Sequence, residues 1–341
     1  MRRPILKRLF RQYGRFFDRQ QADIRLTNYS RKGFTNTLQT RKATLMGRSF
    51  NSPGAPYLLL TLAILFWASN TVVGRAVRDA IPPLAFAFWR WLLATIIILA
   101  VSRRHLKQDW ALIRRSGPIL LLLSAIGIAA FNALLYSGLQ WTTAINSFLL
   151  QAMMPVFIVW LSFLIFKEKV TKGQAAGLLI CLAGAVAIIT KGDPGVLLQL
   201  SFNYGDIYIF VAVVLYAGYS ALLRLRPPVH DLSFMAVTFT LGALILLPLY
   251  LGETVSGRPI EFNRTTILSV GYVALFPSIV SYFCFNRGIA QLGANRGGMF
   301  LYLMPVFGSI LAIIFLGESL HWYHLAGIGL IVPGLIIAAR K

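Results

Sequence analysis

The sequence predicts an all-helical (all-α) polytopic membrane protein with ten transmembrane helices, arranged as two inverted five-helix repeats. Three observations support this prediction: an apolar composition, ten apolar segments of spanning length, and a pattern that recurs after about 150 residues. Hydrophobic residues make up 57% of the 341-residue chain and charged residues only 13%. Soluble domains average about 45–50% apolar and about 25% charged residues, so this composition excludes a soluble globular protein.

Ten segments are long and apolar enough to cross a bilayer, which takes about 20 residues at ~1.5 Å of rise each. They lie near residues 57–75, 83–102, 118–138, 143–166, 173–190, 205–224, 232–251, 266–287, 294–316 and 323–339. The alternating ten-residue pattern of transmembrane β-strands is absent from the sequence. A helical bundle is therefore predicted.

Basic residues are unevenly divided between the two sets of predicted loops. The net charge is +22, and 13 of the 33 Lys and Arg residues precede Asn51. With the N-terminus inside, the inner segments after the tail carry fourteen basic residues and the outer loops carry five. Because basic loops stay in the cytoplasm, both termini are predicted to be cytoplasmic, with the chain in the plasma (inner) membrane. This placement, without any nucleic-acid-binding motif, argues against nucleic acid as a partner.

Residues 1–56 form a basic N-terminal tail whose role the sequence leaves open. The apolar residues between Ile5 and Phe17 fall on one helical face and the basic residues on the other, as in an interfacial amphipathic helix. The Arg-rich composition is also typical of an organelle transit peptide. A disordered tail, an amphipathic or targeting segment, and a start placed upstream of the real initiator Met46 are the three interpretations.

The remaining chain repeats itself. A shift of 150 residues places residues 154–157 on residues 304–307, both with the sequence Met-Pro-Val-Phe, and Gly184 on Gly334. The predicted repeats are residues 57–191 and 204–340. Since each holds five spans, an odd number, the second repeat crosses the membrane in the opposite sense. Inverted repeats are typical of secondary transporters, whose substrate site lies near the midplane between the halves.

The ordered motifs of both halves resemble one known family. They are the Trp-Ala-Ser-Asn stretch of residues 67–70 in the first helix, Arg90 in the second, and the helices that contain Pro155 and Pro305, each followed by a glycine-ridged span. Over residues 57–340 the chain is similar to the EamA-domain family of the drug/metabolite transporter superfamily. The resemblance implies a secondary transporter that exports small metabolites, amino acids or drugs by alternating access.

Polar and aromatic side chains inside the spans predict a substrate cavity between the repeats. Each half has one Asn and one Tyr a single turn apart, in exchanged order: Asn132 and Tyr136, then Tyr282 and Asn286. Polar groups at this depth usually face the bundle interior, where they line a cavity or hydrogen-bond between helices. The residues predicted to bind substrate are Trp67, Asn70, Asn132, Tyr136, Gln151, Tyr216, Tyr282, Asn286 and Tyr302.

Prolines and charges inside or beside the spans give further predictions. Pro155 and Pro305 are predicted to kink their helices, because each leaves the carbonyl four residues earlier without its usual donor. Arg90 is the only full charge deep in a span; it either holds structure or binds an anionic group of the substrate. Glu168 and Glu318 are predicted to cap the helices that follow them.

Motifs for catalysis are missing from the sequence. There is no phosphate-binding glycine loop, nucleophile elbow or metal-ligand set, so no enzyme activity, cofactor or metal is predicted. The predicted partners are a small-molecule substrate, the lipid bilayer and, as an option, a second copy of the chain in a homodimer. A membrane-embedded enzyme or a lipid-handling protein on the same bundle is the alternative, and it predicts chemical conversion or lipid binding without solute flux.

Overall fold

The structure of the chain is a computed structural model, and it describes residues 54–142, 144–201, 203–316 and 319–339. The predictions for residues 1–53 of the N-terminal tail and for Glu318 therefore lie outside the described residues. The chain divides into two compact units, residues 1–53 and 54–341, and every described element belongs to the second. Within the described ranges all regular elements are helices, as predicted.

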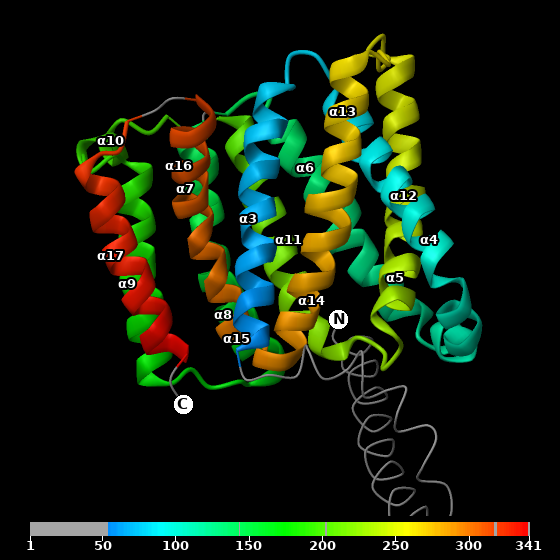
Figure 1. Ribbon diagram of the computed structural model, residues 1–341, viewed down its shortest axis with the longest axis horizontal. Coiled ribbons are helices and arrows are strands. Elements are labelled where there is room, and N and C mark those ends of the chain that lie inside the picture. The colour runs from blue at the N-terminus through cyan, green and yellow to red at the C-terminus, as the bar shows by residue number, and fades with distance from the viewer. Residues whose placement is uncertain (1–53, 143, 202, 317–318, 340–341) are drawn as a thin grey trace, which may run out of the picture. The chain divides into compact units, whose positions relative to one another are not determined.

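The first half of the bundle follows the predicted order of spans, with the third and fourth built from consecutive shorter helices. Its elements are α3 (Ala55–Ala76), α4 (Pro83–Arg115), α5 (Gly117–Ser124), the π-helix η1 (Ala125–Ala130), α6 (Phe131–Gly138), α7 (Ala144–Ala152), α8 (Met154–Phe166) and α9 (Lys172–Ile189). The short α10 (Gly195–Leu198) follows in the connection to the second half (Figure 1).

The second half has the same organisation. Its elements are α11 (Tyr204–Leu222), the 3-10 helix η2 (Leu223–Leu225), α12 (Asp231–Val255), α13 (Arg264–Val273), the π-helix η3 (Ala274–Val280), α14 (Ser281–Leu292), α15 (Ala294–Gly298), the 3-10 helix η4 (Met299–Tyr302), α16 (Leu303–Leu316) and α17 (Trp322–Ala339). Each half therefore places a π-helix within its third span.

Nine helices or runs of helices in the described residues are long and apolar enough to cross a membrane. The predicted segment 294–316 is instead divided into α15, η4 and α16, of which α16 is the longest with 14 residues. The count of ten spans thus stays a prediction. In both halves the interruption lies beside the repeated proline: α8 begins one residue before Pro155 and α16 two residues before Pro305.

The packing of α9 against α17 supports the inversion of the repeats. A Cβ atom at Gly177 would lie 2.5 Å from the carbonyl oxygen of Gly334, and one at Gly184 would lie 2.8 Å from that of Gly327. These contacts make the two helices antiparallel. The 150-residue shift places Gly177 on Gly327 and Gly184 on Gly334. The contact between Gly177 and Gly334 therefore corresponds to the contact between Gly327 and Gly184, as an inverted duplication requires. Figure 1 shows the two helices side by side at one edge of the bundle.

The helix cap expected from Glu168 is wrong. Thr171 is the N-cap of α9, and it forms a capping box with Gln174 in which each side chain accepts a hydrogen bond from the backbone N–H of the other residue. These two hydrogen bonds satisfy backbone N–H groups that would otherwise be free to donate to a carboxylate. Glu168 lies three residues too early, and its carboxylate is instead 3.8 Å from the guanidinium of Arg224.

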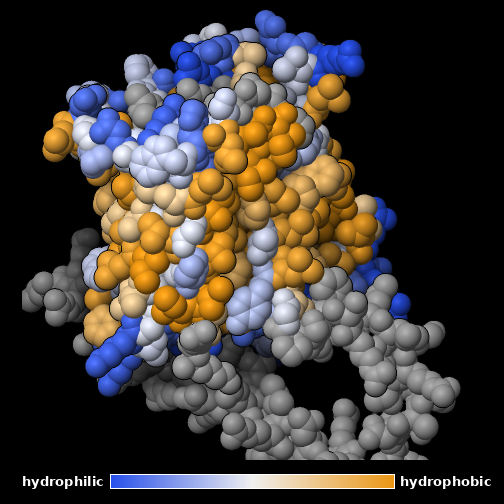
Figure 2. All heavy atoms as spheres, turned by 60° about the vertical axis from the view of Figure 1, so that its left-hand side comes forward, coloured by the Kyte–Doolittle hydropathy of each residue, from blue (hydrophilic) through white to orange (hydrophobic). Residues whose placement is uncertain are grey.

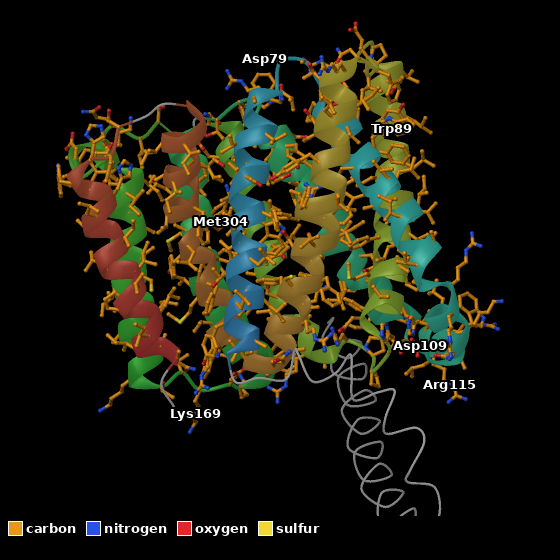
Figure 3. All side chains as sticks on the ribbon, in the orientation of Figure 1. Asp79, Trp89, Asp109, Arg115, Lys169 and Met304 are labelled. Atoms are coloured by element: carbon orange, nitrogen blue, oxygen red, sulfur yellow. The ribbon has the colours of Figure 1, made fainter. Side chains whose placement is uncertain are left out.

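The surface of the bundle matches a membrane environment. Figure 2 shows an apolar belt between hydrophilic ends. In Figure 3, Lys169 and Arg115 lie toward one end of the bundle and Asp79 lies at the opposite end. Apolar surface of this extent is stable only in contact with lipid or another apolar partner, so the chain is an integral, multi-pass membrane protein.

Candidate functional site

A narrow cavity lies between the two halves, about midway between the ends of the bundle, where Figure 3 labels Met304. Its volume is about 30 Å³, which is room for about one or two water molecules. Helices of both halves contribute to its wall. The lining residues are Trp67, Asn70, Thr71, Arg90, Phe131, Asn132, Leu135, Gln151, Met154, Tyr216, Tyr282, Leu301 and Met304.

Arg90, on α4, is held in the cavity wall by four neutral side chains. Its Nη1 donates to Asn70 Oδ1 and Asn132 Oδ1, each at 3.2 Å, and to the Tyr136 hydroxyl at 2.5 Å. Its Nε donates to Ser278 Oγ at 2.9 Å, across the boundary between the halves. The side chain is only 2% exposed. Sequence reasoning selected Asn70, Asn132 and Tyr136 as a substrate site, and the structure shows that they also form the cage around this charge.

The opposite part of the wall is aromatic. The Trp67 ring lies with its centroid 5.6 Å from that of Tyr216, 5.5 Å from that of Tyr282 and 4.8 Å from that of Phe285. The Tyr216 hydroxyl is buried and makes no hydrogen bond with the described residues. This surface offers flat apolar contact area with polar groups at its edge, an arrangement that suits a small amphipathic solute.

Two hydrogen bonds connect the halves at equivalent points of the repeats. The Tyr282 hydroxyl donates to the carbonyl oxygen of Gly127 at 2.6 Å, and the Trp67 indole N–H donates to that of Pro277 at 3.0 Å. Gly127 lies in η1 and Pro277 in η3, and the two are 150 residues apart. A π-helix departs from the α-helical hydrogen-bond pattern, and such segments often occur at functional sites. Each half thus supplies an aromatic donor for the π-helix of the other.

Gln151 lies at the end of α7, directly before the interruption beside Pro155. Its side-chain Nε2 donates to Ser147 Oγ at 3.1 Å, one turn earlier on the same helix face. On the opposite side of the interruption Met154 lines the cavity, and Met304 occupies the equivalent position in the second half. Both methionines directly precede a proline that recurs after 150 residues. This recurrence could have identified them as candidate cavity residues, but the sequence prediction did not include them.

Three predicted residues are not among those that line the cavity. Tyr136 lies behind Arg90, to which it hydrogen-bonds. Asn286 Oδ1 accepts from the Tyr219 hydroxyl at 2.8 Å. Tyr302 is buried, and its hydroxyl makes no hydrogen bond with the described residues. Arg90, predicted to hold structure or bind an anion, also lines the cavity. The other lining residues outside the predicted substrate set are mostly apolar: Thr71, Phe131, Leu135, Met154, Leu301 and Met304.

The cavity wall contains one positive charge and no acidic residue. Within the described part of the chain, no group of three or more His, Cys, Asp or Glu side chains is arranged to hold a metal ion. The chemistry that the wall offers is therefore hydrogen bonding, apolar contact and one fixed cation.

Fold and cavity together define a class of protein: a polytopic membrane protein with a cavity of polar, aromatic and apolar side chains between inverted repeats, as in secondary transporters. The sequence model of the EamA-like transporter family matches residues 54–190 and, a second time, residues 203–340. The chain belongs to the EamA-like transporter family, which confirms the resemblance noted in the sequence.

Individual relatives agree with this assignment. The chain is 26% identical over 289 residues to the uncharacterized transporter YyaM of Bacillus subtilis, covering 83% of this chain and 93% of that one. It is also 26% identical over 293 residues to a probable terminal-alkyne amino-acid exporter of Streptantibioticus cattleyicolor, covering 83% and 92%. These relatives are named for transport and not for catalysis. A protein of known crystal structure shares the fold, with a TM-score of 0.67 at 18% identity, covering 84% of this chain and 97% of that one.

Proposed function

We propose that this protein is a secondary transporter that exports a small organic solute across the plasma (inner) membrane by alternating access. In this proposal the cavity is the solute site, and both termini lie in the cytoplasm. The observation that carries the proposal is a polar-aromatic cavity at mid-depth with a wall built from both halves of an inverted repeat. Two such halves can rock against each other and expose the site to each side in turn.

The small volume of the cavity supports this mechanism. A space of about 30 Å³ is too small for a metabolite, since pockets for small molecules usually measure about 300–1,000 Å³. The halves must therefore separate on one side to admit a solute. The interruptions beside Pro155 and Pro305 lie at the cavity, where Met154 and Met304 line it, and a change in helix direction there would alter access. The π-helices η1 and η3 accept hydrogen bonds from the cavity residues Tyr282 and Trp67, so their movement would also be felt at the cavity wall.

The substrate class is that of small amphipathic metabolites, including amino acids. The aromatic wall around Trp67 and the amides of Asn70, Asn132 and Gln151 suit such solutes. One relative is named as a probable terminal-alkyne amino-acid exporter, and an amino acid belongs to this class of solutes.

Reconstitution tests the proposal. Purified protein is reconstituted in liposomes that are loaded with a mixture of amino acids, aromatic acids and the neutral amides of those acids. Mass spectrometry follows each solute outside the vesicles over time. The proposal predicts saturable, protein-dependent efflux of at least one solute without chemical change. Protein-free liposomes give the background. Chemical conversion of a solute without efflux would instead support a membrane enzyme, and binding of lipid alone would support a lipid-handling protein.

A further inference from the structure

Arg90 carries a buried charge without a counter-ion among the described residues. The four ion pairs in this part of the chain involve Arg78, Arg224, Arg226 and Arg287. The carboxylates that are buried or partly buried among the described residues are bound elsewhere. Asp206 is bound by Thr142 and Asn146, Asp231 by Arg226, Glu168 by Arg224, Asp109 by the backbone N–H of His230, and Glu253 by backbone N–H groups of α4. The cage around Arg90 therefore satisfies hydrogen bonds but leaves the net charge of +1 uncompensated.

One nitrogen of this guanidinium is also available for a ligand. A guanidinium has five N–H donors: one on Nε and two on each Nη. Nε and Nη1 account for all the hydrogen bonds that Arg90 makes with the described residues, and Nη2 makes none. Arg90 contributes to the cavity wall. An unused charged donor thus lies at the proposed solute site.

The single charge of Arg90 and the apolar residues around it favour one kind of anion. A charge at this depth is costly unless an opposite charge pairs with it, and a single guanidinium compensates one negative charge. A carboxylate carries one negative charge, whereas a phosphate monoester carries nearly two at neutral pH. The apolar walls formed by Trp67, Phe131, Tyr216, Met154 and Met304 give an organic solute contacts that chloride cannot use.

We infer that Arg90 is the carboxylate subsite of the cavity, and that the solute is a small organic acid or amino acid with an apolar or aromatic body. This inference rests on the proposed function and names its substrate class. The cage formed by Asn70, Asn132, Tyr136 and Ser278 orients the guanidinium, and the carboxylate of the solute binds Nη2 through a charge-assisted hydrogen bond.

The test compares pairs of probes with the same body, one with a carboxylate and one with the neutral amide: benzoate with benzamide, and indole-3-acetate with indole-3-acetamide. Purified wild-type protein is titrated with each probe at constant ionic strength, and thermal unfolding reports binding, since a ligand that binds the folded state raises its stability. The inference predicts that each carboxylate binds about tenfold or more tightly than its amide.

Substitutions at Arg90 test whether this residue causes the preference for the carboxylate. Arg90→Met should abolish the preference for the carboxylate. Arg90→Lys should retain part of the preference, because the positive charge remains but the Nη2 donor is lost. Arg258→Met, at an exposed arginine outside the cavity, is the matched control and should leave the preference unchanged. If Arg90→Met does not fold, Arg90→Lys takes its place: a reduced preference for the carboxylate supports the inference, and a preference equal to that of wild type contradicts it.

Several results would overturn the inference. Two of them concern wild-type protein: equal binding of acid and amide, and no binding of any carboxylate at millimolar concentration. A third is an unchanged preference for the carboxylate in folded Arg90→Met. The fourth is that chloride stabilises the protein as much as the carboxylates do, which would indicate a site for inorganic anions only. Efflux of neutral solutes in the reconstituted system, together with any of these results, would leave the transporter function intact. Absence of all efflux would instead count against the proposed function.

Discussion

The aromatic side chains at the cavity have structural roles besides the binding roles proposed for them, and Tyr282 shows this most clearly. Its ring lines the cavity, but its hydroxyl donates to the carbonyl of Gly127 in the opposite half. A side chain in this position holds a π-helix of the other repeat and, in the proposed solute site, would also contact the solute. Substitutions there are therefore expected to change stability as well as transport.

Tyr282→Phe should lower the free energy of unfolding by about 1 kcal/mol, because it removes the donor to a buried carbonyl and keeps the ring. Thermal unfolding in detergent measures the change. Tyr204→Phe, at a tyrosine whose side chain is exposed, is the control and should have no measurable effect. Equal stability of Tyr282→Phe and wild type would show that the hydrogen bond between the halves does not stabilise the folded state.

Gln151→Leu should reduce transport strongly and leave stability nearly unchanged. Its side chain lines the cavity, and its hydrogen-bonding partner is Ser147 on the same helix, so the change removes a polar group without breaking a contact between helices. Solute efflux from liposomes and thermal unfolding separate the two effects. Gln291→Leu, on an exposed part of α14, is the matched control. Normal efflux by the Gln151→Leu variant would remove this residue from the site.

The sequence predicted which helix faces carry the polar residues, but not the partners of those residues. Sequence spacing placed Asn132 and Tyr136 on one helix face, and both contact Arg90. The same reasoning gave no partner for Asn286, which hydrogen-bonds to Tyr219, and no partner for Tyr302. Which neighbour a side chain meets depends on the rotation of its helix and on the register between helices, and the period of 3.6 residues does not define these.

At the scale of elements, glycines set how closely α9 and α17 pack. The contacts of Gly177 with Gly334 and of Gly184 with Gly327 leave no space for a methyl group between the backbones. Small residues permit such close approach of helices in membranes, where apolar side chains gain little by leaving lipid. These positions belong to the glycine-ridged spans noted in both halves of the sequence.

Gly177→Ala should destabilise the protein by about 1–3 kcal/mol, since its methyl group would overlap the carbonyl of Gly334 and force the helices apart. Gly329→Ala, on α17 with open space around it, is the matched control and should be neutral or slightly stabilising. Thermal unfolding compares the two variants. Equal midpoints would mean that α9 and α17 can separate without cost.

The π-helices and the divided segment 294–316 were not predicted. The sequence of η1 is an apolar run like that of an ordinary transmembrane helix. In η3, Pro277 lacks the N–H of an α-helical hydrogen bond and was a signal that the sequence prediction did not use. The interruption of 294–316 comes from η4 and from Pro305 together. Hydropathy measures the length of an apolar run but not its continuity as a helix.

At the scale of the whole molecule, the architecture followed from general features of the chain. Apolar content predicted a membrane protein, and the 150-residue shift between the Met-Pro-Val-Phe stretches predicted the two halves that the family match covers. The distribution of basic residues predicts that both termini are cytoplasmic. The volume of the cavity could not be predicted, because it depends on how closely the two halves approach each other.

Deletion of residues 1–45 should leave insertion and transport unchanged, because the spans and their loop charges are expected to define the topology. Membrane fractionation, labelling of termini and solute efflux compare the truncated and full-length proteins. Failure of the truncated protein to insert, or its arrival in a different membrane, would assign the tail a targeting role.

The accessibility of position 151 tests most directly whether the cavity is the path of the solute. In a background with Cys181→Ala and Cys284→Ala, a single cysteine at position 151 is exposed in membranes to a water-soluble thiol reagent. The account predicts a reaction with this cysteine in folded protein, because alternating access opens the cavity to water, and a slower reaction when a transported solute is present. A cysteine that stays inert in folded, transport-competent protein would contradict the account, because the solute would then cross by another route.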